Sequence, residues 1–320
     1  MISFVIRRLV LSVVLLFIIS IISFFIVTLT PGSPYPWGEL NPKISPEVKA
    51  NFRKKFHLDR PLHEQYGLIM RDLFSGNLRS IKDDRPVMSR ILERLPATVA
   101  LNLTSIVISL SFGTLLGVFA ARYAGTWKDG AGSFIAFLFI ALPGFWITYV
   151  VVVALVKGFG VPILGTHSYG IEFPNALASG LDTLWHLLLP ATILALGGIA
   201  SQSRYIRASM IESLREDYIR TARSKGLSEV RVLLGHVLRN ALIPIISASV
   251  AIIPLLFMGS LIVESFFSIP GLGSYLIEAI GSQDFAIVRS MVFVGSLLYI
   301  IGLILTDLCY AWADPRIRLQ

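Results

Sequence analysis

The side chains that usually carry catalysis or bind metals are few in this chain of 320 residues, and their spacing fits no catalytic motif. The candidates for metal binding are scattered: His57, His63, His167, His186, His236 and the single cysteine, Cys309. No histidine pair has the His-Glu-x-x-His spacing, and one thiol can form neither an internal disulfide nor a paired-cysteine metal site. The sequence also lacks a Gly-x-Ser-x-Gly nucleophile elbow and a Gly-x-x-x-x-Gly-Lys-Ser/Thr phosphate loop. We therefore predict no enzyme, no metal site and no ATP site within this chain.

Two carboxylates lie at the ends of long apolar runs, where ionisable groups often have a function. Asp307 lies toward the inner end of the last run, and Glu264 lies at the outer end of the run before it. For Asp307 we favour an interfacial or interhelical hydrogen bond over a proton relay. Glu264 is expected to contact either the adjoining outer loop or a docking protein. Neither is predicted to be a substrate ligand.

The segment 204–241 has the most informative pattern of charged and apolar residues. Apolar or small residues recur four apart, as expected for one face of a helix, at Ile206, Met210, Leu214, Tyr218 and Ala222. Gly226 ends this helix, because glycine readily takes the left-handed conformation that closes a helix. Ser228 can cap a second helix. That helix has an apolar stripe formed by Val230, Leu233, Leu234, Val237, Leu238 and Ala241.

This helix–glycine–helix hairpin is far longer than the connection of about 4–6 residues that two helices need. It also carries eight of the basic residues. One interpretation is an amphipathic hairpin lying on anionic lipid headgroups. The more specific interpretation is that the hairpin docks a cytoplasmic partner.

Composition indicates where the hairpin must lie. Hydrophobic residues make up 54% of the chain, charged residues only 15%, and the mean hydropathy is +0.72. Soluble domains contain about 25% charged residues, so this chain is predicted to lie in a lipid bilayer. The net charge of +8 does not indicate nucleic-acid binding, because the charges lie between hydrophobic runs and not on a polar, stacking-rich surface. We predict an all-α polytopic membrane protein that does not bind nucleic acid.

Six runs reach the roughly 20 apolar residues that a membrane-spanning helix needs. We expect spans at about 9–30, 97–121, 133–157, 185–203, 242–263 and 288–312. Pro143, Pro190 and Pro254 lie in or near these runs, and membrane helices tolerate such kinks. Gly113 and Gly117 form a small-xxx-small pair, which suggests close helix contact.

The basic residues indicate how the spans are oriented. Lys and Arg residues number two, two, eight and two in the inner segments 1–8, 122–132, 204–241 and 313–320. The short outer loops 158–184 and 264–287 contain none. This positive-inside pattern predicts that both termini lie in the cytoplasm.

The predicted spans and their orientation divide the chain into four parts. Residues 1–30 are an uncleaved tail and first span, because the apolar run exceeds the 7–15 or so residues of a signal peptide. Residues 31–96 form a small extracytoplasmic domain, with helices expected around Pro46–Phe56 and through Phe74. Residues 97–312 form the transmembrane domain that contains the hairpin, and 313–320 are a cytoplasmic tail.

The first arm of the hairpin resembles the signature loop of ABC importer permeases. The stretch that carries the resemblance is Asp217-Tyr218-Ile219-Arg220-Thr221-Ala222-Arg223-Ser224-Lys225-Gly226-Leu227-Ser228-Glu229. The general pattern is Glu-Ala-Ala, three residues, then glycine. Here Arg220-Thr221-Ala222 fills the triplet and Gly226 is the glycine. Two of the three triplet residues differ from the general pattern, and the distance from Gly226 to Pro244 is longer. In both respects the sequence resembles the dipeptide/oligopeptide/nickel branch of the family.

Other segments resemble the same branch, in the right order along nearly the whole chain. They are Leu58-Asp59-Arg60-Pro61, Gln65-Tyr66, Arg94-Leu95-Pro96-Ala97-Thr98, Glu264-Ser265-Phe266-Phe267-Ser268-Ile269-Pro270-Gly271-Leu272-Gly273, Asp284-Phe285 and Asp314-Pro315-Arg316. The resemblance implies a type I ABC importer membrane fold with six spans. It also implies a location in the bacterial cytoplasmic membrane.

The resemblance implies a role for each end of the molecule. In this family the short helix before the signature glycine sits in a groove of an ATP-hydrolysing subunit and passes its motion to the spans. The residues that would make this contact are Tyr218, Ile219, Arg220, Thr221, Ala222, Arg223, Lys225, Gly226 and Leu227. On the outer side, an outer gate or a docking site for the binding protein would contain Glu264, Pro270, Gly271 and Gly273.

The implied partners are a homologous second permease subunit, two ATPase subunits that bind ATP and Mg²⁺, and an extracytoplasmic solute-binding protein. Peptides are the leading substrate, with nickel, glutathione and oligosaccharides as alternatives. A secondary transporter is less favoured. It would need ionisable groups at the membrane midplane and broken helices in matching halves, whereas this sequence offers only Asp307 and has no internal symmetry.

Overall fold

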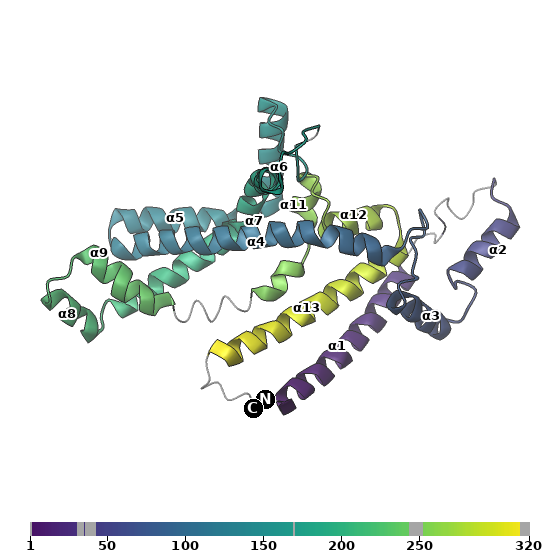
Figure 1. Ribbon diagram of the computed structural model, residues 1–320, viewed down its shortest axis with the longest axis horizontal. Coiled ribbons are helices and arrows are strands. Elements are labelled where there is room, and N and C mark those ends of the chain that lie inside the picture. The colour runs from purple at the N-terminus through teal and green to yellow at the C-terminus, as the bar shows by residue number, and fades with distance from the viewer. Residues whose placement is uncertain (1, 31–34, 36–42, 169, 243–251, 314–320) are drawn as a thin grey trace.

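The protein is an assembly of helices, consistent with the predicted all-α class (Figure 1). This computed structural model describes residues 2–30, 35, 43–168, 170–242 and 252–313. In chain order the elements are α1 (Ile2–Leu29), α2 (Pro46–Lys55), α3 (Leu62–Phe74), α4 (Val87–Arg122), α5 (Trp127–Ala141), α6 (Gly144–Val152), the π-helix η1 (Val153–Gly158), α7 (Ala176–Ser213), α8 (Asp217–Ser224), α9 (Glu229–Val232), the π-helix η2 (Leu233–Val237), the 3₁₀-helix η3 (Ile253–Phe257), α11 (Leu261–Phe266), α12 (Leu272–Gly281) and α13 (Phe285–Ala313). The extended pairing in these ranges is one isolated bridge, Arg79 to Pro86.

Four of the described helices, α1, α4, α7 and α13, are long and apolar enough to cross a membrane. The predicted third span differs from the structure. Instead of one helix over 133–157, α5 and the α6–η1 helix meet at an angle of 89°. Pro143 stands at this break, where its ring prevents the helix from continuing and favours an extended conformation for Leu142.

Residues 243–251 of the predicted fifth span, 242–263, lie outside the described residues. Its described portion is not one continuous helix, because η3 ends at Phe257 and α11 begins at Leu261. Pro254 lies in the first turn of η3, where its missing N–H leaves no bond unmade.

The contact between α4 and α7 holds the centre of the molecule together. A Cβ atom added at Gly113 would lie 2.6 Å from Gln202 Cβ, and one added at Gly117 would lie 2.6 Å from Ile206 Cβ. The two glycines therefore let the backbones approach closely, which confirms the predicted small-xxx-small contact.

Helices α1 and α13 run antiparallel and are joined at both ends (Figure 1). Arg8 Nε lies 2.7 Å from Asp307 Oδ2 at one end. At the other end, Arg289 Nη2 donates to Thr28 Oγ1 at 2.9 Å. Asp307 thus makes an interhelical ion pair, whereas an interfacial or interhelical hydrogen bond was expected; its Oδ2 has no hydrogen-bond partner among the described residues. The start of α1 and the end of α13 lie on one side of the molecule (Figure 1).

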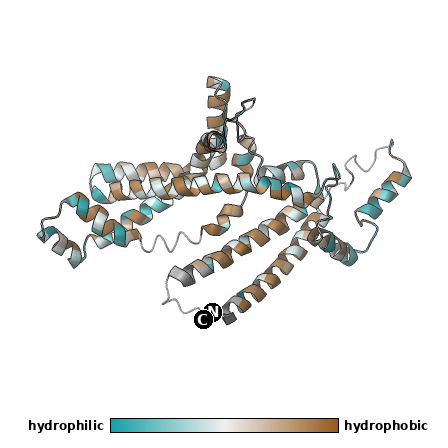
Figure 2. Cartoon of the chain, viewed as in Figure 1, coloured by the Kyte–Doolittle hydropathy of each residue, from teal (hydrophilic) through white to brown (hydrophobic). Residues whose placement is uncertain are grey.

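The segment between α1 and α4 contains two helices that match the expected positions. Ser45 caps α2 by accepting the N–H of Val48, and Pro46 occupies the first helical position. Figure 2 shows that α2 is mainly hydrophilic, whereas α1 and α13 are mainly hydrophobic. This segment is not independent of the spans. The end of α3 shares a hydrophobic core with α4, α12 and α13, formed by Leu73, Leu78, Val87, Ile91, Leu272, Tyr275, Ala279, Ala286, Ile287, Met291, Phe293 and Val294.

Candidate functional site

The predicted hairpin is present, but its first arm is two helices and not one. Helix α7 extends past the predicted end of its span and stops at Ser213, and α8 begins at Asp217. The N–H of Glu216 bonds the carbonyl of Ser213 at 3.2 Å within the intervening turn. The apolar four-residue spacing is local and continues through this turn, so it did not reveal the break.

Gly226 forms the turn between the two arms of the hairpin, as predicted. Its φ is +74°, in the left-handed region, and its N–H bonds the carbonyl of Arg223 at 2.9 Å. A Cβ added there would meet no atom within 4 Å. The requirement for glycine is therefore conformational and not steric, because a left-handed residue with a Cβ costs about 1–2 kcal/mol.

One face of α8 is buried within this protein. Ile219 is 0% exposed and Ala222 is 6% exposed. They join a compact core, hereafter the hairpin core, which contains Ala121, Ile206, Met210, Ile219, Ala222, Val232, Leu233, Val237 and Ala241. The hairpin is thereby fixed to the C-terminal ends of α4 and α7. In the second arm Val232 is buried instead of Val230 and Leu234, which are exposed; this corrects the predicted stripe.

The other face of α8 is open. Exposed residues on this face and in the turn that follows are Tyr218, Arg220, Thr221, Arg223, Lys225 and Gly226, while Leu227 packs partly against the hairpin core. Arg223 Nε donates to Glu229 Oε1 at 2.8 Å, and Arg220 pairs with Asp217 at 3.3 Å in a pair that is almost fully exposed. The structure therefore separates the predicted contact residues into a buried set and an accessible set.

An ion pair that was not predicted from the sequence holds the inner end of α7 to α5. Arg207 donates from Nε to Asp129 Oδ1 and from Nη2 to Asp129 Oδ2, each at 2.6 Å. Asp129 is buried and also accepts the N–H of Gly125 at 3.0 Å. No local sequence pattern indicates this pair, because Asp129 and Arg207 are 78 residues apart and Arg207 is one of the eight basic residues of segment 204–241.

On the opposite side, Glu264 is fully buried and organises the outer loop. Its carboxylate accepts the N–H of Ser260 and of Ser274, each at 3.0 Å, and the hydroxyl of Thr98 at 3.1 Å. Thr98 Oγ1 in turn accepts the N–H of Leu272 at 2.8 Å. Of the two contacts that the sequence left open for Glu264, the structure shows the one with the outer loop.

The outer-loop glycines lie beside this carboxylate. A Cβ on Gly271 would lie 2.6 Å from Thr98 Oγ1, and one on Gly273 would lie 2.6 Å from the carbonyl carbon of Ser260. Pro270 is exposed. Three of the four residues predicted for an outer gate or docking site, Glu264, Gly271 and Gly273, thus lie together in the interior. The fourth, Pro270, is accessible. Thr98 was missed as part of this group, although it ends the Arg94–Thr98 motif.

The chain matches a known family over most of its length. Residues 113–319 match the family described as binding-protein-dependent transport system inner membrane component, and residues 1–102 match the model of its N-terminal region. The chain belongs to this family. It is a polytopic permease component with the type I ABC importer membrane fold.

Three relatives show how complete the similarity is. The oligopeptide transport system permease protein AppB of Bacillus subtilis is 34% identical, covering 99% of this chain and 100% of that protein. The dipeptide transport system permease protein DppB of Lactococcus lactis is 32% identical, and the di/tripeptide transport system permease protein DppB of Pseudomonas aeruginosa is 33% identical. Both alignments cover 100% of each chain.

Proposed function

We propose that this permease forms half of the translocation pathway of an ATP-driven peptide importer in the bacterial cytoplasmic membrane. Support for peptides comes from full-length similarity to permeases of oligopeptide, dipeptide and di/tripeptide systems. Nickel, glutathione and oligosaccharides have no comparable support. An ion-coupled carrier is also disfavoured, because the carboxylate of Asp307 is held by Arg8 at 2.7 Å.

The coupling role rests on one observation, the two-faced burial of α8. Ile219 and Ala222 fix the helix to the hairpin core, while Tyr218 and Arg220 stay exposed. A force applied to the exposed face would pass to α4 and α7 through packed side chains, because interiors are densely packed and deform little. A loose loop would absorb the same displacement.

The full assembly would contain a homologous second permease subunit, two ATPase subunits and an extracytoplasmic solute-binding protein. The ATPases would bind ATP and Mg²⁺ and would meet the exposed face of α8 from the cytoplasm, where both termini would also lie. The binding protein would meet the opposite surface, which includes Pro270. Its contacts would not include Glu264, Gly271 or Gly273, which are buried.

Uptake of labelled di- and oligopeptides by cells with and without this chain tests the transport proposal. Loss of uptake, restored by the wild-type chain but not by Gly226→Pro, is the expected result, since proline fixes φ near −65° and cannot adopt +74°. Gly226→Asn is the matched control, because asparagine tolerates the left-handed region better than other residues. Unchanged peptide uptake in cells that lack the chain would contradict the peptide assignment.

Charge reversal on α8 tests the coupling proposal separately. Arg220→Glu should reduce both uptake and the amount of ATPase that co-purifies in mild detergent, while membrane insertion stays normal. Lys128→Glu is the matched control, because Lys128 is partly exposed on the same predicted cytoplasmic side but outside the hairpin. Equal ATPase retention by Arg220→Glu and Lys128→Glu would show that this face of α8 is not the contact.

A further inference from the structure

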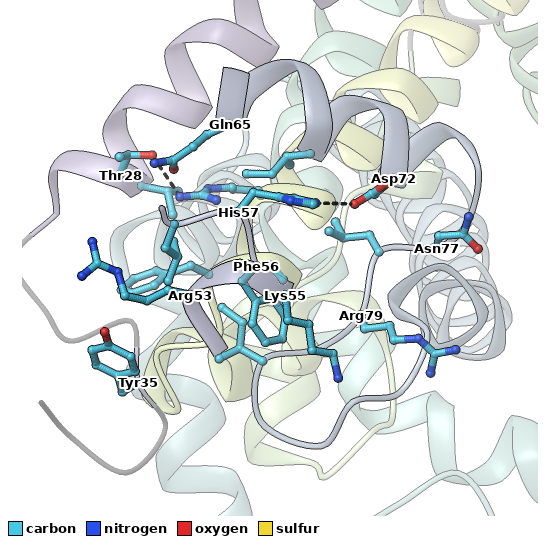
Figure 3. Close-up of a pocket in the computed structure, with 18 of the residues that line it drawn as sticks. Thr28, Tyr35, Arg53, Lys55, Phe56, His57, Gln65, Asp72, Asn77 and Arg79 are labelled. Carbon is cyan, nitrogen blue, oxygen red and sulfur yellow. Dashed lines mark hydrogen bonds and ion pairs between the residues drawn. The ribbon is translucent and has the colours of Figure 1, made fainter. Parts of the chain in front are cut away.

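A pocket of about 450 Å³ lies away from both the hairpin and Glu264. It is enclosed by α2, α3 and the loop after α3, together with the end of α1 and the start of α13 (Figure 3). The lining combines apolar side chains such as Val27 and Ile69 with hydroxyl, amide and charged groups.

Positive charge dominates this lining. Four positively charged side chains, Arg53, Lys55, Arg79 and Arg289, line the pocket, and Asp72 is the one carboxylate among the described residues of its lining. His57 already holds that carboxylate at 2.9 Å, as Figure 3 shows. Lys55 pairs with Asp84 at 2.7 Å, whereas Arg53, Arg79 and Arg289 have no carboxylate partner among the described residues. The pocket therefore keeps an excess of positive charge.

Arg289 is the partly buried cation of this pocket. Its Nη2 donates to Thr28 Oγ1 at 2.9 Å, and its guanidinium carbon lies 5.1 Å from the centre of the Phe24 ring. Its Nε is buried and has no hydrogen-bond partner among the described residues, but this atom lies out of reach of the pocket. The Nη groups of the same guanidinium are the donors available to a ligand there. A guanidinium presents a planar fork of donors that matches the oxygens of a phosphate or carboxylate.

The position of the pocket identifies the source of that oxyanion. Thr28 and Arg289 lie at the adjoining ends of α1 and α13, where apolar spans meet the polar outer segment. Ile26 and Leu29 on α1 are 62% and 72% exposed, so acyl chains can lie along this helix. Basic residues at such an interface attract anionic lipids. A zwitterionic choline headgroup would instead place a second cation among Arg53, Lys55 and Arg79.

We propose that this pocket binds the phosphate of an anionic phospholipid headgroup, with Arg289 as the inner ligand and Arg53 at the rim. Arg53 is exposed and has no ion-pair partner among the described residues, so it is free to contact the headgroup. The lipid would fix the α2–α3 segment to the outer ends of α1 and α13.

Lipid retention by the full-length chain, purified in mild detergent with any bound subunits, tests the proposal. Native mass spectrometry after exchange into phosphatidylglycerol or phosphatidylcholine should show a strong preference for phosphatidylglycerol. Arg53→Gln should lower retention about fivefold, in keeping with about 1 kcal/mol for each basic residue near a membrane surface, and Arg289→Gln should lower it further. Lys54→Gln is the matched control, since Lys54 is exposed on the same helix but does not line the pocket.

Three outcomes would overturn the proposal. The first is equal retention of phosphatidylglycerol by wild type and Arg53→Gln, a comparison that stands even if Arg289→Gln misfolds. The second is displacement of the lipid by millimolar inorganic phosphate or glycerol phosphate, which would make the ligand a soluble phosphate. The third is protection of the pocket by an acidic peptide but not by phosphatidylglycerol, which would make it a protein-docking site.

Discussion

Arg207 and Asp129 form a two-pronged ion pair, with Nε and Nη2 of the arginine each 2.6 Å from a different carboxylate oxygen. The pair ties the start of α5 to the inner end of α7, next to Ile206 of the hairpin core. It therefore fixes the base from which the hairpin extends. Any motion of α8 that reaches α7 must also move or break this pair.

Asp129→Asn should destabilise the permease by about 1–3 kcal/mol, because it removes a charged acceptor and leaves Arg207 poorly paired. Thermal unfolding in detergent measures this loss. Asp217→Asn is the matched control, since the Asp217–Arg220 pair is 93% and 78% exposed and should contribute less than about 0.5 kcal/mol. Equal Tm values for Asp129→Asn and wild type would show that the ion pair is not needed for stability.

Gly117→Ala should weaken the contact between α4 and α7. The new methyl group would lie 2.6 Å from Ile206 Cβ and 2.7 Å from the carbonyl oxygen of Ser203, and the backbone atom cannot rotate away. Overpacking of this kind costs about 1–3 kcal/mol.

Gly197→Ala on α7 is expected to raise the Tm, whereas Gly117→Ala is expected to lower it, both measured by thermal unfolding in detergent. A Cβ at Gly197 meets nothing within 4 Å, so alanine should stabilise the helix by about 0.5–1 kcal/mol. A lower Tm for Gly197→Ala than for Gly117→Ala would contradict the packing described for these two helices.

Thr98→Val should loosen the outer loop, because the N–H of Leu272 would lose its acceptor at 2.8 Å and Glu264 would lose a donor. An unsatisfied buried donor costs about 1–3 kcal/mol. Amide hydrogen exchange across α12 should become faster than in wild type. Thr192→Val is the matched control, because its hydroxyl donates to the carbonyl of Leu188 within one helix and the residue is only partly buried. Unchanged exchange in α12 would exclude a loop-fixing role for Thr98.

The pKa of Asp83, in the loop before α4, predicts how the stability of the protein depends on pH. Partial burial raises the pKa of its carboxyl, but the Ser80 side chain, the N–H of Arg85 and the charge of Arg90 together hold that pKa below its ordinary value. A lowered pKa in the folded state means that the carboxylate stabilises the protein above its ordinary pKa of about 3.9 and loses this effect as the pH falls.

The Tm advantage of wild type over Asp83→Asn should therefore be present at pH 7 and shrink as the pH is lowered from about 5 to 3. Asp59→Asn is the control, because the nearest cation lies at 4.0 Å and the pair is largely exposed. An advantage that grew toward pH 3 would contradict the lowered pKa.

The amino-acid sequence by itself determined the fold class, four of the six expected apolar spans, the hairpin with its turn at Gly226, and the family resemblance. These features depend on local information. Hydropathy over about 20 residues identifies a span, and the left-handed preference of a single glycine identifies a turn. The two helices of the outer segment, near Pro46 and Phe74, were recognised for the same reason.

Tertiary structure alone decided which polar groups meet and which face of each helix is buried. Asp129 and Arg207 are 78 residues apart, and Thr98 and Glu264 are 166 residues apart, so no local pattern could pair them. The same holds for α8, whose amphipathic sequence allowed contact with lipid, a partner or its own chain. Packing against α4 and α7 buries Ile219 and Ala222 in the hairpin core and leaves Tyr218 and Arg220 exposed. The burial of a side chain depends on the neighbours that the fold brings together.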